Sequence, residues 1–130
     1  MESFSVRTPG RCAFVDVTSE VADVIKGSGV ASGAAVVFVA HTTAGVTINE
    51  NADPDVQSDI LAHLDRAVPQ SARYDHSEGN SPAHVKASMM GSSVTVIVEK
   101  GAGVLGTWQG IYLCEFDGPR TRTVHVKVIG

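Results

Sequence analysis

The chain has 130 residues, of which 43% are hydrophobic and 18% are charged, and its formal net charge is -4. This size and composition allow one buried core without disulfides or a structural metal, so we predict a single domain over residues 1–130. The few basic residues exclude the dense positive surface that nucleic-acid binding requires. No apolar run approaches the roughly 18 residues of a membrane span, and no leader-like run follows Met1, so we expect a cytoplasmic protein without membrane partners.

The first part of the chain predicts a hairpin, a short helix and a central strand. Two strand-like runs, residues 3–7 and 11–17, are joined by a Pro-Gly turn. Thr18 or Ser19 is expected to cap a helix that ends at Gly27. Residues 34–40 are apolar at every position, which predicts a strand at the centre of a sheet, covered on both faces.

The second part predicts two helices and three strands. Asp53-Pro54 places an N-cap before a proline at the first helical position, and a helix to about residue 67 follows. Ser81-Pro82 repeats this arrangement for a helix through Met90, ended by Gly91. The predicted strands cover residues 93–98, 110–116 and 123–128. The last of them alternates strictly between valine and polar residues, so one sheet face is wet or covered by another subunit.

The segment from residue 41 to 53 is the first candidate for a functional site. His41 follows the central strand, where a side chain can be held rigidly at the mouth of a site, or can simply bond to backbone. Asn49, Asn51 and Asp53 carry oxygen ligands that suit a hard cation, although the spacing is not that of an EF-hand. Asp53 also has a sufficient structural role as an N-cap.

The segment from residue 74 to 86 is the second candidate. His84 lies in the first turn of a predicted helix, whose N-terminus attracts anions. His41, His76 and His84 are alternatively the three protein ligands of a zinc-like metal site with one open position. Their separations in sequence leave both interpretations open. Lys86 is either a ligand for an anion or a solvated helix residue.

Two further segments carry groups that can contact a ligand. Four glycines between residues 101 and 110 indicate a tight loop, but the Gly-Lys-Ser/Thr sequence of a phosphate-binding P-loop is absent. In this loop Trp108 is either a core anchor or a surface on which a ligand stacks, and Gln109 can form hydrogen bonds with a polar ligand. Arg120 and Arg122 lie in a predicted turn and suit a phosphate or a carboxylate, or form a solvated hairpin tip.

These segments together resemble the YjbQ-like family, often described as secondary thiamine-phosphate synthases. The matching motifs are His41-Thr42-Thr43-Ala44, Asn49-Glu50-Asn51-Ala52-Asp53-Pro54, Ala83-His84-Val85-Lys86-Ala87-Ser88, Gly106-Thr107-Trp108-Gln109-Gly110-Ile111 and Asp117-Gly118-Pro119-Arg120. The resemblance covers nearly the whole chain. It implies an α+β fold with a strongly bent, sandwich-like, mostly antiparallel sheet and a few short helices, and it implies a homotrimer.

The resemblance also implies a reaction on small phosphorylated molecules. A hydroxymethylpyrimidine diphosphate would be joined to a thiazole phosphate with release of pyrophosphate, assisted by cationic groups or a divalent metal such as Mg²⁺ or Zn²⁺. The residues expected to act in catalysis are His41, His84 and Asp53, and those expected to bind substrate are Asn49, Asn51, Lys86, Trp108, Gln109 and Arg120. Two alternatives remain: a metal-assisted hydrolase or transferase that uses the same histidines, and a non-catalytic trimer that binds a small anion or metabolite.

Overall fold

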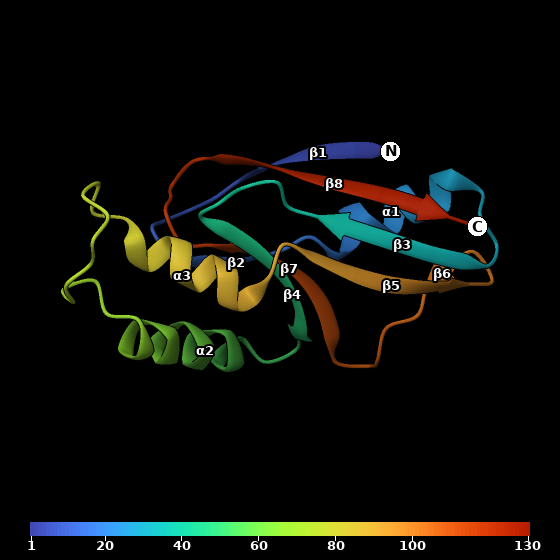
Figure 1. Ribbon diagram of the computed structural model, residues 1–130. Coiled ribbons are helices and arrows are strands. Elements are labelled where there is room, and N and C mark those ends of the chain that lie inside the picture. The colour runs from blue at the N-terminus through green and yellow to red at the C-terminus, as the bar shows by residue number, and fades with distance from the viewer.

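The computed structural model describes residues 1–130, which form three helices and eight strands (Figure 1). In chain order these are β1 (Glu2–Arg7), β2 (Ala13–Asp16), α1 (Thr18–Ser28), β3 (Gly33–Phe38), β4 (Ala44–Glu50), α2 (Pro54–Ala67), α3 (Ser81–Met90), β5 (Ser93–Glu99), β6 (Ala102–Gly103), β7 (Gln109–Glu115) and β8 (Thr121–Ile129). No helix is long and apolar enough to cross a membrane.

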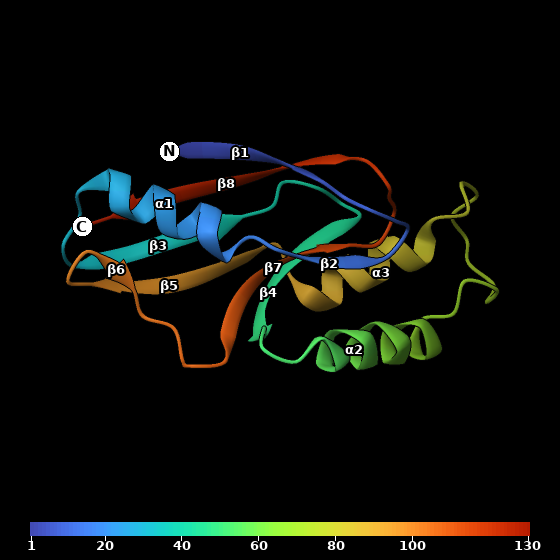
Figure 2. The same ribbon diagram turned by 180° about the vertical axis from the view of Figure 1, so that it is seen from behind.

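The strands form two antiparallel sheets. The larger has the order β1-β8-β3-β5-β6 and the smaller the order β2-β7-β4. Figures 1 and 2 show α1 lying across one side of the larger sheet, while α2 and α3 lie side by side next to the smaller one. The predicted α+β fold with a bent antiparallel sheet is confirmed, and β3 occupies the centre of the larger sheet as expected.

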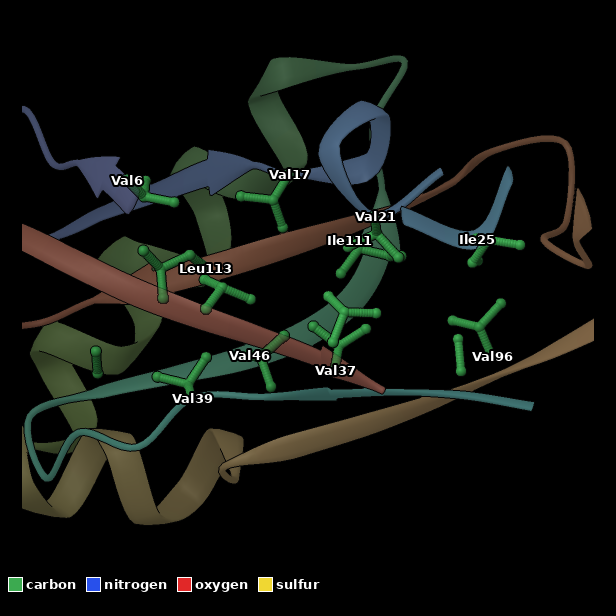
Figure 3. Packing of buried hydrophobic residues seen from close by; sticks show 14 of the residues in the cluster. Val6, Val17, Val21, Ile25, Val37, Val39, Val46, Val96, Ile111 and Leu113 are labelled. Atoms are coloured by element: carbon green, nitrogen blue, oxygen red, sulfur yellow. The ribbon is translucent and has the colours of Figure 1, made fainter. Parts of the chain in front are cut away.

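The main core lies between the larger sheet, α1 and one face of the smaller sheet (Figure 3). It is built largely from valines, including Val124 and Val126, which the alternation in β8 places on its inner face. A second cluster lies between α2, α3 and the other face of the smaller sheet. Its buried members are Leu64, Ala83, Ala87, Cys114 and Phe116. Both faces of β7 are therefore buried.

The outer face of the larger sheet is bare in the single chain. Phe38, Ile97 and Ile129 are 42%, 59% and 54% exposed, and Figure 1 looks onto this side of β3, β5 and β8. The expectation that the central strand is covered on both faces is therefore wrong for one chain. Aliphatic side chains on an open sheet face are typical of a surface that another molecule covers.

Strand β4 lies in a segment for which the sequence predicts no regular element. Val46 is fully buried in the main core and Ile48 packs against it, so the segment does contain a short alternating pattern. Gly45 is needed for a different reason, since a Cβ atom there would lie 2.7 Å from the carbonyl oxygen of Gly91. This glycine allows the end of α3 to approach β4 closely.

Both ends of α1 differ from the prediction. Its N-cap is Val17 rather than Thr18 or Ser19, and the carboxylate of Asp16 accepts the Thr18 backbone N–H at 2.9 Å. The helix continues past Gly27 because the left-handed conformation falls at Gly29, with φ of 71°.

The other two helices follow the prediction more closely. The side chain of Asp53 caps α2 by accepting the Asp55 N–H at 2.9 Å. Helix α3 ends at Gly91 as predicted, but its N-cap is Asn80 rather than Ser81, and no side chain caps its first turn.

Candidate functional site

The predicted site residues fall into two groups at opposite ends of the ladder between β4 and β7. Ala44 pairs with Glu115 at one end of this ladder, and Glu50 pairs with Gln109 at the other. A strand rises about 3.3 Å per residue, so the ends lie about 20 Å apart. The "His41 end" carries His41, His76, His84 and Arg120, and the "Trp108 end" carries Asn49, Asn51, Asp53, Trp108 and Gln109.

An open hollow of about 490 Å³ lies at the His41 end. His41 enters it from the connection between β3 and β4, and His84 enters it from α3. The other lining residues are Thr42, Ala44, Ala87, Ser88, Gly91 and Ser92. No carboxylate lines this hollow, whereas hydroxyl groups and two imidazoles do. Its chemistry therefore favours a ligand that accepts hydrogen bonds.

The hydrogen bond of His41 fixes which ring nitrogen carries the proton. The backbone N–H of Thr123 donates to Nε2 of His41 at 3.0 Å. Burial, followed by the charge of Arg122, lowers the pKa of His41, so the ring is neutral at pH 7. A neutral ring that accepts at Nε2 carries its proton on Nδ1. His41 therefore has an N–H group to offer to a ligand and no free lone pair.

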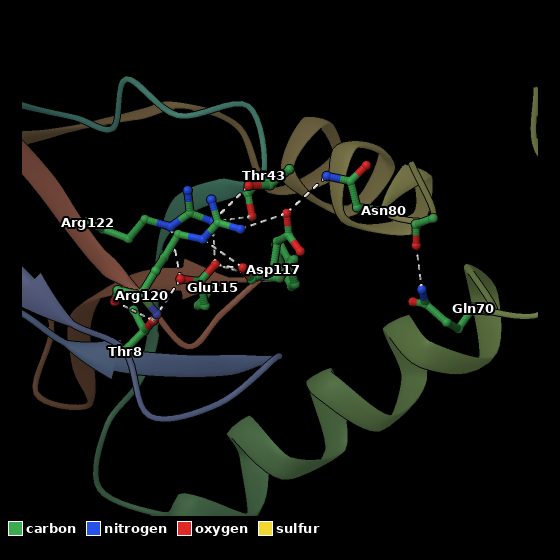
Figure 4. A network of polar contacts seen from close by, with 10 residues as sticks. Thr8, Thr43, Gln70, Asn80, Glu115, Asp117, Arg120 and Arg122 are labelled. Atoms are coloured by element: carbon green, nitrogen blue, oxygen red, sulfur yellow. Dashed lines mark hydrogen bonds and ion pairs between the residues drawn. The ribbon is translucent and has the colours of Figure 1, made fainter. Parts of the chain in front are cut away.

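A buried ion pair supports this end of the ladder (Figure 4). Arg122 and Glu115 are 3% and 0% exposed, and the guanidinium donates to both carboxylate oxygens at 2.9 and 2.5 Å. Arg122 also donates to the hydroxyl of Thr43 at 2.8 Å, while the hydroxyl of Thr8 donates to Glu115 at 2.8 Å. This network anchors β8 to the start of β4, directly beside His41.

The sequence predicts that Arg122 shares a turn with Arg120, and this is wrong, because Arg122 lies in β8 and is buried. No role is predicted for Thr43 or Thr8 alone. A charged residue in a strand is ordinarily taken as solvent-facing, and their partners are distant in sequence. The available signal is the alternation in β8, which puts Arg122 on the same inward face as Val124 and Val126.

Arg120 lies close to this network but is already engaged. Its Nε donates to the backbone oxygen of Asp117 at 2.9 Å, and its Nη2 lies 3.2 Å from the Asp117 carboxylate. That carboxylate also accepts the side-chain amide of Asn80 at 3.0 Å. The side chain of Arg120 is 49% exposed, but it does not line the hollow.

Lys86 is not available to a ligand. Its side chain is 1% exposed and its ammonium donates to the carboxylate of Asp65 on α2. It also lies 5.9 Å from the centre of the Phe116 ring. The ammonium holds the pKa of Asp65 below its ordinary value by hydrogen bonding. The expectations that Lys86 binds a phosphate or is solvated are both corrected: it joins α3 to α2.

The three histidines do not assemble into one metal site in the single chain. The rings of His76 and His84 meet edge to face, with centroids 5.4 Å apart, but His41 has no free lone pair in this conformation. No three His, Cys, Asp or Glu side chains are close enough to hold one ion. The residues present therefore do not fit a three-histidine zinc site within one chain.

The Trp108 end presents an indole on a well-fixed loop. Trp108 is 62% exposed, so the core-anchor interpretation is wrong for the single chain. The backbone oxygen of Trp108 accepts the N–H of Asn51 at 2.8 Å, and the side chain of Gln109 accepts the N–H of Gly106 at 2.8 Å. Gly110 is required here, since a Cβ atom would lie 2.6 Å from the amide nitrogen of Asn51. Gln109 therefore has a structural role in holding the loop.

The polar side chains beside Trp108 bond within their own turns. Asn49 accepts the N–H of Glu50 at 2.7 Å, Glu50 accepts the N–H of Ala52 at 3.0 Å, and Asp53 caps α2. Each retains a second lone pair on the accepting oxygen. Their predicted role in positioning a cation stays a prediction.

The chain belongs to the UPF0047 protein YjbQ-like family, whose model matches residues 2–130. It is 50% identical to the UPF0047 protein YugU of Bacillus subtilis over 131 residues, which cover 100% of this chain and 99% of the relative. It is 49% identical to a UPF0047 protein of Methanocaldococcus jannaschii over 127 residues, covering 98% and 92% of the two chains.

Solved structures show the same fold. The crystal structure of an uncharacterised YjbQ/UPF0047 protein from Clostridium acetobutylicum superposes with a TM-score of 0.98 and 56% identity, covering 99% of this chain and 100% of that one. A protein of unknown function from Sulfolobus solfataricus superposes with a TM-score of 0.96 at 33% identity, covering 99% and 95%. The names of these relatives specify a family and no reaction.

Proposed function

We propose that the chain binds a small phosphorylated molecule at the His41–His84 hollow. The observation that carries this proposal is the composition of the lining: hydroxyl groups, the Nδ1–H of His41 and a second imidazole, without any carboxylate. Phosphate oxygens are strong hydrogen-bond acceptors, and a site rich in donors suits them. Arg120 and Arg122 lie near this end, but Asp117 and Glu115 balance their charges, so the donors of the lining, and not a net positive charge, carry the proposal.

The reaction that we propose for this ligand is the one the family resemblance implies. In the joining of a hydroxymethylpyrimidine diphosphate to a thiazole phosphate, negative charge develops on the departing pyrophosphate. His41 and His84 would donate hydrogen bonds to those oxygens. A divalent cation such as Mg²⁺ would enter with the diphosphate and neutralise part of its charge. Asn49, Asn51 and Asp53 carry oxygens that suit such a cation, but in one chain they lie at the Trp108 end, about 20 Å from the hollow.

The second candidate is a protein that binds a phosphorylated metabolite without turning it over. The observation in its favour is the arrangement of His41, whose Nε2 is occupied by the Thr123 N–H. A general base needs a free lone pair, whereas a binding site needs only donors. Both candidates place the ligand at the same hollow and differ only in turnover.

The first test is calorimetric titration of the protein with inorganic pyrophosphate, with and without Mg²⁺. His41→Ala and His84→Ala should each weaken binding by about 5- to 100-fold, as loss of one hydrogen bond to a charged group does. His63→Ala is the matched control, because His63 lies on the exposed face of α2. Unchanged affinity in both site variants would refute the proposal.

Release of pyrophosphate from the two-substrate mixture then separates the candidates. A transferase should release pyrophosphate only when both substrates are present, and His41→Ala should slow it. Pyrophosphate binding without release identifies the binder.

A further inference from the structure

We propose that the Trp108 end of one copy of this chain completes the His41–His84 hollow of a second copy, so that each ligand site is built by two chains. The inference rests on the proposed function, since it concerns the same hollow. The partner of the hollow is a second copy of the chain, and the loop that enters the hollow is the one that carries Trp108.

One chain cannot bring the two ends together. The pairing of β4 with β7 is continuous from Ala44–Glu115 to Glu50–Gln109, without a break at which the ladder can fold. The ends are therefore held about 20 Å apart by a rigid sheet. A small phosphorylated ligand in the hollow cannot reach the indole of its own chain.

The Trp108 loop has the properties of a binding surface. The loop is fixed by backbone and side-chain hydrogen bonds, yet it exposes 62% of Trp108 and 54% of Val104 to solvent. A fixed backbone lowers the entropic cost of burying the side chain that it carries, and tryptophan is enriched at the centres of interfaces.

The helix that lines the hollow also carries an exposed apolar pair that suits an indole. Val85 and Met89 lie one turn apart on α3 and are 41% and 53% exposed. They adjoin His84 and Ser88, which line the hollow. A methionine thioether beside an aromatic ring is a favourable contact. The indole can therefore cover this pair while the polar wall remains available to the ligand.

The charges of the two ends are complementary. The Trp108 end carries Asp16, Glu50, Asp53 and Asp55, none of which forms an ion pair, and no Lys or Arg occurs in residues 44–58 or 101–113. Asp16 pairs with Tyr112 between β2 and β7, and the hydroxyl of Tyr112 donates to the backbone oxygen of Glu50 at 3.2 Å, so both acidic residues lie near this end.

The opposite end carries the arginines. Arg7 pairs with Thr121 at the start of β8, the backbone oxygen of Arg11 accepts the N–H of Gly118, and Arg120 lies in the same turn. Arg11 and Arg120 form ion pairs with Asp65 and Asp117, so Arg7 is the one of the three without a carboxylate partner. Complementary charge favours contact between the two ends over contact between like ends. Because the two patches differ, the contact is head to tail, and such contacts form a ring when the rotation between neighbouring copies closes.

Mixing of inactive variants tests whether two chains build one site. His41→Ala and Trp108→Ala should each weaken pyrophosphate binding as pure proteins, because the first removes a hydrogen-bond donor and the second removes the side chain that closes the hollow. When they are co-expressed in equal amounts with different tags, about a quarter of the sites should regain full affinity, because each site draws two chains at random. The calorimetric stoichiometry measures this fraction.

The control is a mixture of His41→Ala with His84→Ala, which alter the same half of the site and should regain nothing. Absence of recovery in the first mixture, or normal binding by pure Trp108→Ala, overturns the inference while leaving the proposed function intact.

A second measurement does not depend on ligand binding. A photo-crosslinking amino acid in place of Trp108 should join two chains, with the crosslinked peptide falling in residues 84–92 or 41–44. Crosslinks confined to one chain, or to another surface, overturn the inference. If the unsubstituted protein binds no pyrophosphate but this crosslink forms, the proposed ligand is wrong and the shared interface stands.

Discussion

Arg122 on β8 and Glu115 on β7 form an ion pair that is buried from water, and the two hydroxyl groups bonded to it, those of Thr8 and Thr43, lie in different loops. Removal of one charge from such a pair leaves the other buried and uncompensated, whereas replacement of both by apolar groups is often tolerated. The pair therefore fixes the position of β8 beside His41, but it is not by itself a source of net stability.

We expect Glu115→Gln to lower the free energy of unfolding by about 3–5 kcal/mol, because Arg122 then stays buried without its counter-charge. Urea unfolding followed by circular dichroism measures this. Glu99→Gln is the control, since the Glu99 carboxylate is exposed and accepts only from Ser32, and it should change stability by about 0.5 kcal/mol or less. Equal effects of the two substitutions would contradict the role assigned to the pair.

The same carboxylate makes stability depend on pH. Burial opposes ionisation of Glu115, but hydrogen bonds from Arg122, the Asp117 N–H and the Thr8 hydroxyl hold its pKa below the ordinary value. A depressed pKa in the folded state stabilises the fold above the unfolded pKa of about 4.3, and this stabilisation is lost as the pH falls through the folded-state pKa. Urea midpoints should therefore fall less steeply with acid in Glu115→Gln than in the unsubstituted chain. Parallel profiles would show that another group is responsible.

At the scale of elements, α2 is attached to the rest of the chain by few contacts. Leu64 is its one buried side chain, while Asp65 binds Lys86 and Gln57 donates to the hydroxyl of Tyr112 at 2.6 Å. A helix held at so few points should open locally before the sheets do. The ion pair with Lys86 also holds α2 against α3, since Asp65 is the only carboxylate partner of this buried lysine.

We predict that Leu64→Ala destabilises the chain by about 2–5 kcal/mol and speeds amide exchange in residues 54–67 more than in β3. The cavity left beside Phe116 and Cys114 explains the cost. Hydrogen exchange read by mass spectrometry separates local from global opening. His63→Ala, one residue away on the exposed face, should leave both quantities unchanged, and uniform acceleration across the chain would contradict local opening of α2.

At the scale of the whole molecule, the exposed outer face of the larger sheet favours association of several copies of the chain. Ile97, Ile129 and Phe38 form an apolar surface that water contacts in the single chain. Covering such a surface stabilises an assembly in proportion to the apolar area removed from water. This supports the homotrimer that the family resemblance implies, which we keep as a proposal.

The expected mass in solution is three times the 13.6 kDa of one chain, as light scattering would measure. Ile97→Lys should shift the mass toward that of one chain, because a buried ammonium without a partner is costly. Ala62→Lys, on the exposed face of α2, should not. A single-chain mass for the unsubstituted protein would remove both the trimer and the shared site.

Structural features that depend only on neighbouring residues could be predicted from the sequence. The N-cap at Asp53, the inward valines of β8 and the end of α3 at Gly91 follow from local hydrogen bonding and side-chain periodicity, and all three are confirmed. Motifs in chain order were also sufficient to predict the family and, through it, the bent antiparallel fold.

The positions of the functional groups depend on the tertiary fold and could not be predicted from the sequence. Lys86 is buried because its partner, Asp65, comes from another helix, and Arg122 is buried because Glu115 lies across a turn on another strand. The ladder between β4 and β7 separates His41 from Trp108, although both belong to motifs that the sequence predicts to share a site. These arrangements depend on contacts between residues distant in the chain, which local propensity and periodicity do not specify.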